Sequence, residues 1–219
     1  MPSPFTVKAE IVEVGRRLHQ NGMIAGTDGN ISVRLDDNRI MITPSGVSKG
    51  HMKADDMVIV DVNGRHLQGK GRGSSEMAMH LFVYRNRPEI RACVHAHPIH
   101  ATAFAVAGLA LAEDVLPEVV VFVGGIPLTD YAPPGTDAVP KSLEPFIEKQ
   151  NAFLLRNHGL LTIGRSLDEA LFRHETVEHY AHIVSVARQL GNIHKIPSDD
   201  FRRLESMRAK LDAAWDKKD

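Results

Sequence analysis

The chain has 219 residues, with 26 lysines and arginines against 27 aspartates and glutamates, and a formal net charge of -1. This length is enough for one domain with a sizeable hydrophobic core. The balanced charge gives no electrostatic reason to expect nucleic acid or an anionic membrane as a partner, so a small-molecule ligand is favoured.

The first residues and the cysteine content indicate the compartment. The chain lacks the charged start and apolar stretch of a secretory signal, and no segment reaches the roughly 18 apolar residues of a membrane span. Cys93 is the single cysteine, which excludes an internal disulfide and a multi-cysteine zinc site. We therefore expect a cytoplasmic protein in which any metal is bound by His, Asp or Glu.

The chain begins with a predicted helix and a predicted hairpin. Apolar residues recur at helical spacing after Thr6, which we expect to cap a helix that ends near Gly22. After a glycine-rich turn, residues 31–35 and 39–43 are predicted to be two strands joined by a polar turn at residues 36–38.

A further strand and a helix are expected next. Residues 57–62 are rich in β-branched side chains and are followed by Asn-Gly, a strong turn signal. Ser74 or Ser75 is a candidate cap for a helix that continues to the Arg-Pro pair at residues 87–88. Glu76 is then expected in the first turn of this helix, where the helix dipole is positive.

The second half of the chain is predicted to alternate strands with helices. In order, the pattern predicts a strand at 90–96, a helix at 98–106, a buried strand at 119–123, a helix at 137–149, strands at 153–156 and 160–163, a long helix at 167–190 and a charged helix from residue 198. No repeat, low-complexity segment or linker interrupts this order. We expect one α/β domain over residues 1–219.

Three histidines form a candidate metal site. His95 and His97 lie at the end of a predicted strand at spacing i and i+2, so both imidazoles project from one face and can hold one ion. His158 lies in a turn between two apolar strands, where Gly159 is expected to allow a tight turn. Three neutral imidazoles suit Zn²⁺, or another divalent cation such as Mn²⁺ or Co²⁺, and leave a coordination position for substrate.

The His-x-His pair also has other interpretations. Such a pair also arises by chance in a chain with 12 histidines. An amidohydrolase barrel would place it on the first of many repeated βα units, whereas here it lies mid-chain. A cupin-like barrel would be nearly all strand, which the predicted helices contradict. The remaining histidines, His80 among them, need no role beyond packing or solvation.

Three loops have the composition of an anion site. Residues 27–30, 43–46 and 73–76 each combine glycine with hydroxyl or amide side chains, and the last precedes a helix. Each loop alone is also explained as a turn or a helix cap, but together they predict a phosphate site. Lys49 is close to the second loop, although a loop lysine is usually solvated.

Five motifs, in this order, resemble the class II aldolase/adducin family: Gly29-Asn30-Ile31-Ser32-Val33-Arg34, Thr43-Pro44-Ser45-Gly46, Ser74-Ser75-Glu76, His95-Ala96-His97 and Asn157-His158-Gly159. Within that family they are most similar to the aldolases of L-fuculose 1-phosphate. The resemblance implies a three-layer α/β/α domain with a mostly antiparallel central sheet. It also implies a homotetramer with active sites at the subunit interfaces.

The resemblance implies a role for each matching residue. His95, His97 and His158 would bind Zn²⁺, and Glu76 would be the catalytic acid/base. The substrate phosphate would be held by Gly29, Asn30, Ser45, Gly46, Ser74 and Ser75. The implied reaction is cleavage of a ketose 1-phosphate to dihydroxyacetone phosphate and an aldehyde through a metal-stabilised enediolate.

The sequence departs from the family at the second acid/base. Family aldolases use a tyrosine, whereas residues 114–118 read Asp-Val-Leu-Pro-Glu. Glu118 and Tyr131 are the candidate replacements. A dehydratase or decarboxylase of sugar phosphates or sugar acids uses the same parts, and Glu118 is compatible with either. A non-catalytic adducin-like interaction domain is the third alternative, against which the retained histidines and Glu76 argue.

Overall fold

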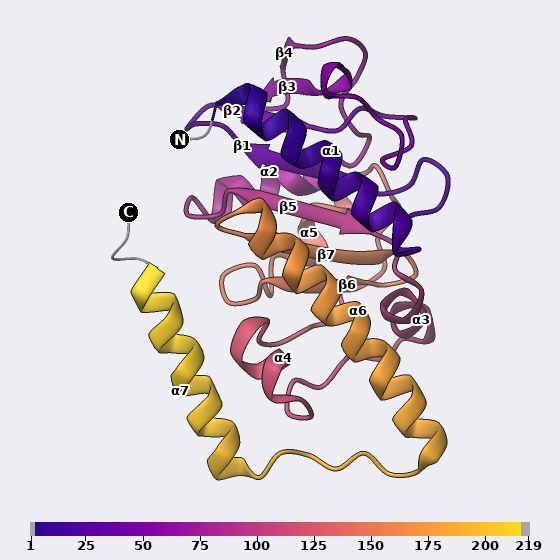
Figure 1. Ribbon diagram of the computed structural model, residues 1–219, viewed down its shortest axis with the longest axis vertical. Coiled ribbons are helices and arrows are strands. Elements are labelled where there is room, and N and C mark those ends of the chain that lie inside the picture. Colours follow the sequence, from indigo (N-terminus) through magenta and orange to yellow (C-terminus); the bar gives the residue numbers. More distant parts are fainter. Residues whose placement is uncertain (1–2, 216–219) are drawn as a thin grey trace.

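A seven-stranded sheet forms the centre of the computed structural model, which describes residues 3–215 (Figure 1). Along the sheet the strand order is β4-β3-β2-β1-β5-β7-β6, and every neighbouring pair of these strands is antiparallel. The strands are β1 (Asn30–Arg34), β2 (Arg39–Ile42), β3 (Val58–Asp61), β4 (His66–Gln68), β5 (Ala92–Ala96), β6 (Ala152–Leu155) and β7 (Gly159–Gly164).

Helices cover both faces of this sheet, as the three-layer expectation requires. They are α1 (Pro4–Gln20), the short 3-10 helix η1 (Ala54–Asp56), α2 (Met77–Asn86), α3 (Ile99–Ala107), α4 (Pro117–Phe122), α5 (Ala138–Leu143), α6 (Leu167–Leu190) and α7 (Ser198–Trp215). In Figure 1, α1 and α6 cross the near face of the sheet, while α2 and α5 lie behind it. The structure therefore confirms the predicted fold class.

The two faces of the sheet are built by strict alternation along the strands. On β2, Met41 belongs to the apolar cluster under α1 and α6, while Ile40 and Ile42 belong to the cluster under α2 and α5. On β1, Ile31 faces the first cluster with 0% exposure. Because successive strand residues point to opposite faces, β2, β3 and β5 each contribute apolar side chains to both clusters. This alternation fixes the register on which the candidate site depends.

Several predicted elements are confirmed with small shifts in their ends. The hairpin of β1 and β2 pairs Ser32 with Ile42, and the long helix at 167–190 matches α6. The first helix begins earlier than expected, at Pro4, and its cap is Ser3, whose hydroxyl accepts a hydrogen bond from the amide of Thr6. Thr6 is therefore not the cap, because Pro4 suits the first helical turn.

The prediction of a strand at residues 119–123 is wrong, because this segment belongs to helix α4. Pro117 occupies its first turn, and Gly124 follows it with a φ of 85°. A short run of valines fits a buried strand and a buried helix equally well. Here Val119 and Val123, spaced by one helical turn, both pack into the cluster beneath α6.

Two smaller differences concern exposed or irregular segments. The helix expected at 137–149 is regular only over α5, and turns complete it. Strand β4 was missed because its three residues are all exposed and carry no apolar alternation. Among residues 3–215, no helix combines the length and the apolar character that a membrane crossing requires.

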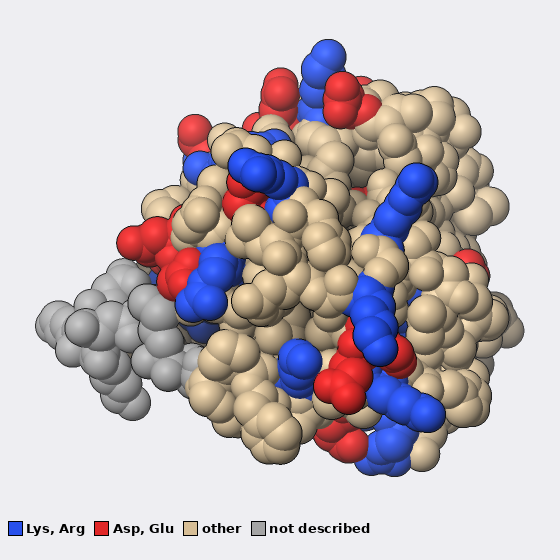
Figure 2. Space-filling model, turned by 90° about the horizontal axis from the view of Figure 1, so that it is seen from above, with Lys and Arg blue, Asp and Glu red and all other residues tan. Residues whose placement is uncertain are grey.

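Charged side chains of both signs are mixed on the face seen in Figure 2. Lysines and arginines there lie next to aspartates and glutamates, and much of that face is covered by other residues. This distribution agrees with the formal net charge of -1.

Candidate metal centre and cavity

The three predicted metal ligands meet at one end of the sheet. His95 is fully buried on β5, between β1 and β7, and His97 follows directly after the strand. His158 lies in the turn between β6 and β7. One nitrogen from each ring lies within 4.8 Å of the other two, and Nε2 of His95 is 3.2 Å from Nε2 of His97.

The turn that carries His158 is shaped by its two neighbours. Asn157 adopts a left-handed conformation with a φ of 55°, which asparagine tolerates better than most residues. A Cβ atom at Gly159 would lie 2.5 Å from the ring of His97 and 2.6 Å from the carbonyl oxygen of Ala96. Gly159 is therefore needed because His97 and Ala96 lie so close to it. The left-handed backbone angle of this turn occurs at Asn157 instead.

A hydrogen bond orients the ring of His95 as a candidate metal ligand, and a carboxylate lies near that of His97. Nδ1 of His95 donates to the carbonyl oxygen of Leu160 at 2.9 Å, which leaves the lone pair of Nε2 facing the other two rings. Asp28 lies 3.6 Å from Nδ1 of His97 on the side away from His95 Nε2. Burial, together with His95 and His158, lowers the pKa of His97 to about 4, so its ring is neutral at pH 7.

This donor set fits a divalent cation. Two neutral imidazole nitrogens that face one another at 3.2 Å repel unless a cation or a proton lies between them. Two nitrogens bound to one tetrahedral zinc ion are about 3.3 Å apart, given the usual zinc–nitrogen bond length. Three imidazoles without a thiolate suit Zn²⁺ and chemically similar divalent ions.

Glu76 points its carboxylate at these histidines. It is the N-cap residue of α2 rather than a first-turn residue as expected, and its backbone amide donates to Oγ of Ser74 at 3.2 Å. Its side chain caps no helix N–H group. Instead, Oε1 lies 2.9 Å from Nε2 of His158, and Oε2 lies 3.3 Å from Nε2 of His95.

The electrostatic surroundings keep Glu76 ionised. Burial acts to raise the pKa of its carboxyl. Positive charge at His95, which a proton carries when no cation is bound there, and hydrogen bonds to His158 and His95 outweigh this and hold the pKa well below its usual range. The pKa of His95 responds to the same contact. Burial acts to lower this pKa, but the charge of Glu76 raises it, and the net effect is an increase. An ionised carboxylate beside a candidate cation site can accept and return a proton.

A chain of buried side chains leads from the core to Glu76. Nδ2 of Asn30 donates to Oε2 of Glu76 at 2.8 Å, and Oδ1 of Asn30 accepts from Nε2 of His80. Nδ1 of His80 lies 2.7 Å from Oγ of Ser32, which lies 2.7 Å from the hydroxyl of Tyr84. Burial lowers the pKa of His80 to about 3, so its neutral ring donates to Asn30 and accepts from Ser32.

The role of His80 was missed by the sequence analysis, although a signal exists. Asn30 and Ser32 are spaced i and i+2 on β1, while His80 and Tyr84 are spaced i and i+4 on α2. Each pair therefore lies on one face of its element. When two elements that carry polar residues at these spacings pack together, hydrogen bonds between their side chains are expected.

A cavity of about 480 Å³ opens beside the histidines and Glu76. Its described lining contains all six residues expected to hold phosphate, namely Gly29, Asn30, Ser45, Gly46, Ser74 and Ser75. Glu76, His97 and His158 also line it, as do Thr27, Asp28, Lys49, Pro134 and Gly135. The structure therefore brings the three predicted loops and two of the three candidate metal ligands, His97 and His158, to one cavity.

Two glycines of these loops are required by their conformation. Gly29 has a φ of 70°, and a Cβ atom there would lie 2.7 Å from the carbonyl oxygen of His95. Gly46 has a φ of 72°. Both angles lie in the left-handed region that disfavours residues with a side chain.

The candidates for the second acid/base lie away from this cavity in the chain. Glu118 is exposed in the first turn of α4, and the side chain of Tyr131 is 59% exposed. Neither is among the described residues that line the cavity. Their roles remain predictions.

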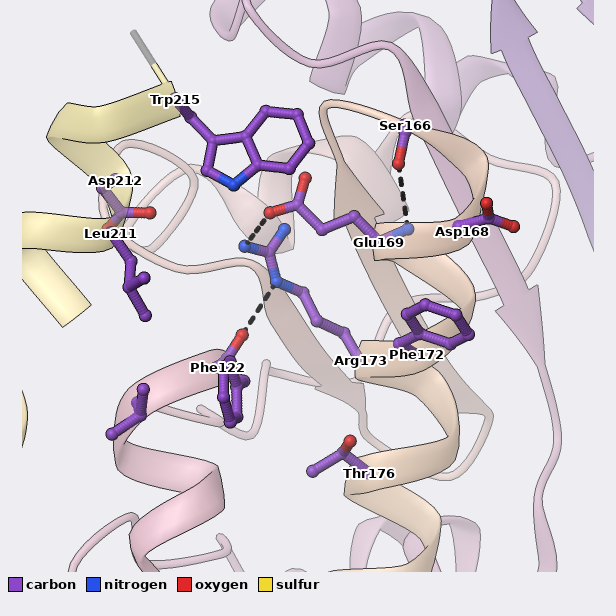
Figure 3. A pocket seen from close by; sticks show the side chains of 11 residues that line it. Phe122, Ser166, Asp168, Glu169, Phe172, Arg173, Thr176, Leu211, Asp212 and Trp215 are labelled. Carbon is purple, nitrogen blue, oxygen red and sulfur yellow. Dashed lines mark hydrogen bonds and ion pairs between the residues drawn. The ribbon is translucent and has the colours of Figure 1, made fainter. Parts of the chain in front are cut away.

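A larger cavity, of about 560 Å³, lies between α4, α6 and α7 (Figure 3). Aromatic side chains, including Phe122 and Phe172, line it. Its cation, Arg173, is already paired, since the guanidinium donates to the carbonyl oxygen of Phe122 at 3.1 Å and to Glu169 at 2.6 Å. None of the three clustered histidines lines this cavity, so we assign the chemistry to the smaller one.

The sequence of the chain is similar to those of known proteins. The family described as Class II Aldolase and Adducin N-terminal domain matches residues 9–185. An L-fuculose phosphate aldolase from Methanococcus maripaludis is 35% identical over 181 residues, covering 83% of this chain and 97% of its own. A 3-oxo-tetronate 4-phosphate decarboxylase from Pectobacterium atrosepticum is 32% identical over 210 residues, covering 93% of this chain and 94% of its own.

Solved structures share the fold over nearly the whole chain. The crystal structure of YgbL from Escherichia coli superposes with a TM-score of 0.86 at 29% identity, covering 92% of this chain and 99% of that one. An L-fuculose 1-phosphate aldolase superposes with a TM-score of 0.85 at 31% identity, covering 92% and 95%.

Proposed function

Because the chain belongs to the class II aldolase/adducin family, we propose that it is a metal-dependent lyase that breaks a carbon–carbon bond of a phosphorylated sugar. The observation that carries the proposal is the position of Glu76, whose oxygens lie 2.9 Å and 3.3 Å from two of the three candidate metal ligands. The same carboxylate lines a cavity that holds all three glycine-containing loops.

The proposed roles follow from this arrangement. A divalent cation held by His95, His97 and His158, most simply Zn²⁺, supplies a Lewis acid that stabilises negative charge on substrate oxygen. The six loop residues bind the phosphate and so fix the reacting carbons against Glu76. Glu76 carries a proton to or from the carbon at which the bond breaks, and Asn30 holds its carboxylate in place.

Our first candidate is an aldolase of a ketose 1-phosphate such as L-fuculose 1-phosphate. Cleavage leaves the enediolate of dihydroxyacetone phosphate and an aldehyde. Glu76 takes up a proton from solvent and passes it to the enediolate carbon. The relative from M. maripaludis, an L-fuculose phosphate aldolase, supports this candidate. The reaction also needs a base for the hydroxyl proton of the departing fragment. We propose Glu118 or Tyr131 for it, reaching the site of a neighbouring subunit in a homotetramer.

A decarboxylase is the second candidate, and a specific observation favours it. Loss of carbon dioxide from a 3-oxo-tetronate 4-phosphate leaves the same enediolate of dihydroxyacetone phosphate. The departing carboxylate is already ionised, so this reaction needs no second base. The one proton it consumes is taken up from solvent by Glu76 and passed to the enediolate carbon. A decarboxylase would therefore not need the tyrosine that residues 114–118 lack. A 3-oxo-tetronate 4-phosphate decarboxylase also aligns with 93% of the chain.

The two candidates share one product and differ in the other. We would incubate zinc-loaded protein with L-fuculose 1-phosphate and, separately, with a ¹³C-labelled 3-oxo-tetronate 4-phosphate. Dihydroxyacetone phosphate is measured by a coupled reductase, and the co-product is identified by ¹³C NMR as an aldehyde or as carbon dioxide. A chelator-treated sample is the control. No dihydroxyacetone phosphate from either substrate, with zinc bound, would overturn the proposed function.

A further inference from the structure

Lys49 is a buried cation in the wall of the cavity that contains Glu76. Only 2% of the residue is exposed, so it is not the solvated loop lysine that its sequence position suggests. Its Nζ atom donates to the carbonyl oxygens of Thr27 at 2.7 Å and Val47 at 2.8 Å. An ammonium group has three N–H donors, so one is left for a ligand.

The charge of Lys49 lacks a close counter-ion among the described residues. No carboxylate of residues 3–215 lies within the 4.0 Å limit of an ion pair with Nζ. Burial lowers the pKa of Lys49, and Asp28 and Glu76 act in the opposite direction from farther away. Glu76 itself contacts His95 and His158. A buried cation is costly without an anion beside it, which an anionic ligand would provide.

The rest of the predicted phosphate site is electrically neutral. Gly29, Asn30, Ser45, Gly46, Ser74 and Ser75 offer N–H and O–H donors but no formal positive charge. Among the described residues that line the cavity, Lys49 is the only lysine or arginine. A phosphate monoester carries close to two negative charges at neutral pH, and charge-assisted hydrogen bonds are the strong ones.

The position of Lys49 is fixed before any ligand binds. Helix α1 packs directly on its backbone, since a Cβ atom at Gly15 would lie 2.5 Å from the carbonyl oxygen of Lys49. The two carbonyl acceptors, of Thr27 and Val47, hold the other end of the side chain. A preorganised donor binds its ligand without the entropy cost of ordering a mobile lysine.

We propose that Lys49 is a specificity-determining residue that binds the phosphate monoester of the substrate and selects phosphorylated over unphosphorylated sugars. This inference rests on the proposed function, since it names the group by which the lyase recognises its substrate. Lys49 neutralises part of the phosphate charge, and the neutral loop residues supply the remaining hydrogen bonds. It takes no part in breaking the carbon–carbon bond.

The test measures phosphate binding directly and therefore does not depend on turnover. Inorganic phosphate is titrated into zinc-loaded wild type, Lys49→Met, Lys49→Arg and Lys53→Met by calorimetry, and glycolate serves as a non-phosphate anion. Lys53→Met is the matched control, because Lys53 is exposed outside the cavity. Lys49→Gln is a second uncharged variant that keeps a donor for one carbonyl. A chelator-treated wild-type sample reports any phosphate bound by the metal itself.

We expect Lys49→Met and Lys49→Gln to bind phosphate roughly ten- to a hundredfold more weakly than wild type, with unchanged zinc content. Lys49→Arg should bind within about threefold of wild type, and Lys53→Met should match it. Unchanged phosphate affinity in both uncharged variants would overturn the proposal, as would equal binding of glycolate and phosphate by wild type.

Failure of this inference is distinguishable from failure of the proposed function. Normal release of dihydroxyacetone phosphate with the same KM in wild type and Lys49→Met would remove Lys49 from substrate recognition and leave the reaction intact. Loss of phosphate affinity in Lys49→Met, with no cleavage of any sugar phosphate by wild type, would retain the anion site and reject the reaction.

Discussion

The side-chain nitrogen of Asn30 lies 2.8 Å from Oε2 of Glu76 and donates a hydrogen bond to it. The other end of the Asn30 amide accepts from His80, so the amide has no freedom to flip. Sequence similarity predicts a phosphate-binding role for Asn30. The structure shows that its side-chain amide also bonds to Glu76 and His80, which use two of its four hydrogen-bonding positions.

His80 is therefore expected to act as a positioning residue for Glu76. His80→Leu should lower kcat by about ten- to a hundredfold, because a misplaced proton carrier is costly even when the substrate binds normally. KM and zinc content should change little. His80→Gln, which can still donate to Asn30, should recover part of kcat.

The control for His80 is an exposed histidine on α6, His179. His179→Gln should leave kcat and KM unchanged. A parallel fall in kcat and zinc content in His80→Leu would contradict the prediction, because it would mean that the metal centre itself had collapsed.

Glu76→Gln should separate metal binding from catalysis. The amide keeps the size of the side chain but cannot carry a proton, so we expect zinc content near that of wild type and turnover lower by about 10²–10⁴-fold. Metal analysis and steady-state kinetics on the same preparation provide the measurement. A fully active Glu76→Gln enzyme would rule out the proposed role of this carboxylate.

Most helices and strands and the grouping of the candidate site residues could be predicted because their signals are local, whereas the three-layer fold was expected from the resemblance to the family. The hairpin at residues 31–43, the histidine pair and the loop glycines depend on neighbours in sequence, and the structure places each of them as expected. The link from His80 to Asn30 depends on α2 packing over β1, which no local pattern specifies. Similarly, the packing of Val119 and Val123 from α4 and its C-cap into the cluster beneath α6 is a long-range contact that the run of valines does not specify.

The burial of the charged residue Lys49 could not be predicted from the sequence either. Its burial follows from the packing of α1 on the loop after Gly46, and no sequence pattern distinguishes it from a solvated lysine. In contrast, Glu76 could be assigned from its motif, although its place at the N-cap, with the carboxylate turned toward the histidines, became visible only in the structure.

Removal of metal should destabilise the protein. His95, His97 and Glu76 are buried or partly buried with their polar atoms facing one another, so the cation offsets an otherwise costly cluster. We expect about one zinc ion per chain by elemental analysis and a Tm that rises with added zinc. His95→Ala should lose zinc, activity and this rise together, and retention of zinc by that variant would contradict the ligand assignment.

A buried histidine outside the site should make stability depend on pH. Nδ1 of His174 bonds to Thr162, while Nε2 is buried without a partner in the described residues, and burial lowers the pKa of His174 to about 3. In the unfolded chain this histidine binds a proton with its ordinary pKa of 6.5, so the contribution is complete above pH 6.5 and is lost as pH falls toward 3.

Urea unfolding of the metal-free protein at pH 7 and pH 5 measures this effect. The free energy of unfolding of wild type should fall between these pH values by about 1–2 kcal/mol more than that of His174→Leu. Metal-free samples are compared because zinc binding has its own pH dependence. An equal pH dependence in the two proteins would show that His174 is not the neutral buried group described here.

The second acid/base decides between the two candidate reactions. Aldol cleavage must remove a hydroxyl proton, whereas decarboxylation starts from an ionised carboxylate. If the chain is an aldolase, Glu118→Gln or Tyr131→Phe should lower kcat by about 10²–10⁴-fold, because the base is lost. If it is a decarboxylase, both variants should release carbon dioxide at rates near that of wild type. Both side chains are exposed on the described subunit, so a large effect would also indicate that they reach the cavity of a neighbouring subunit. Aldehyde release that survives both substitutions would exclude Glu118 and Tyr131 together as the base.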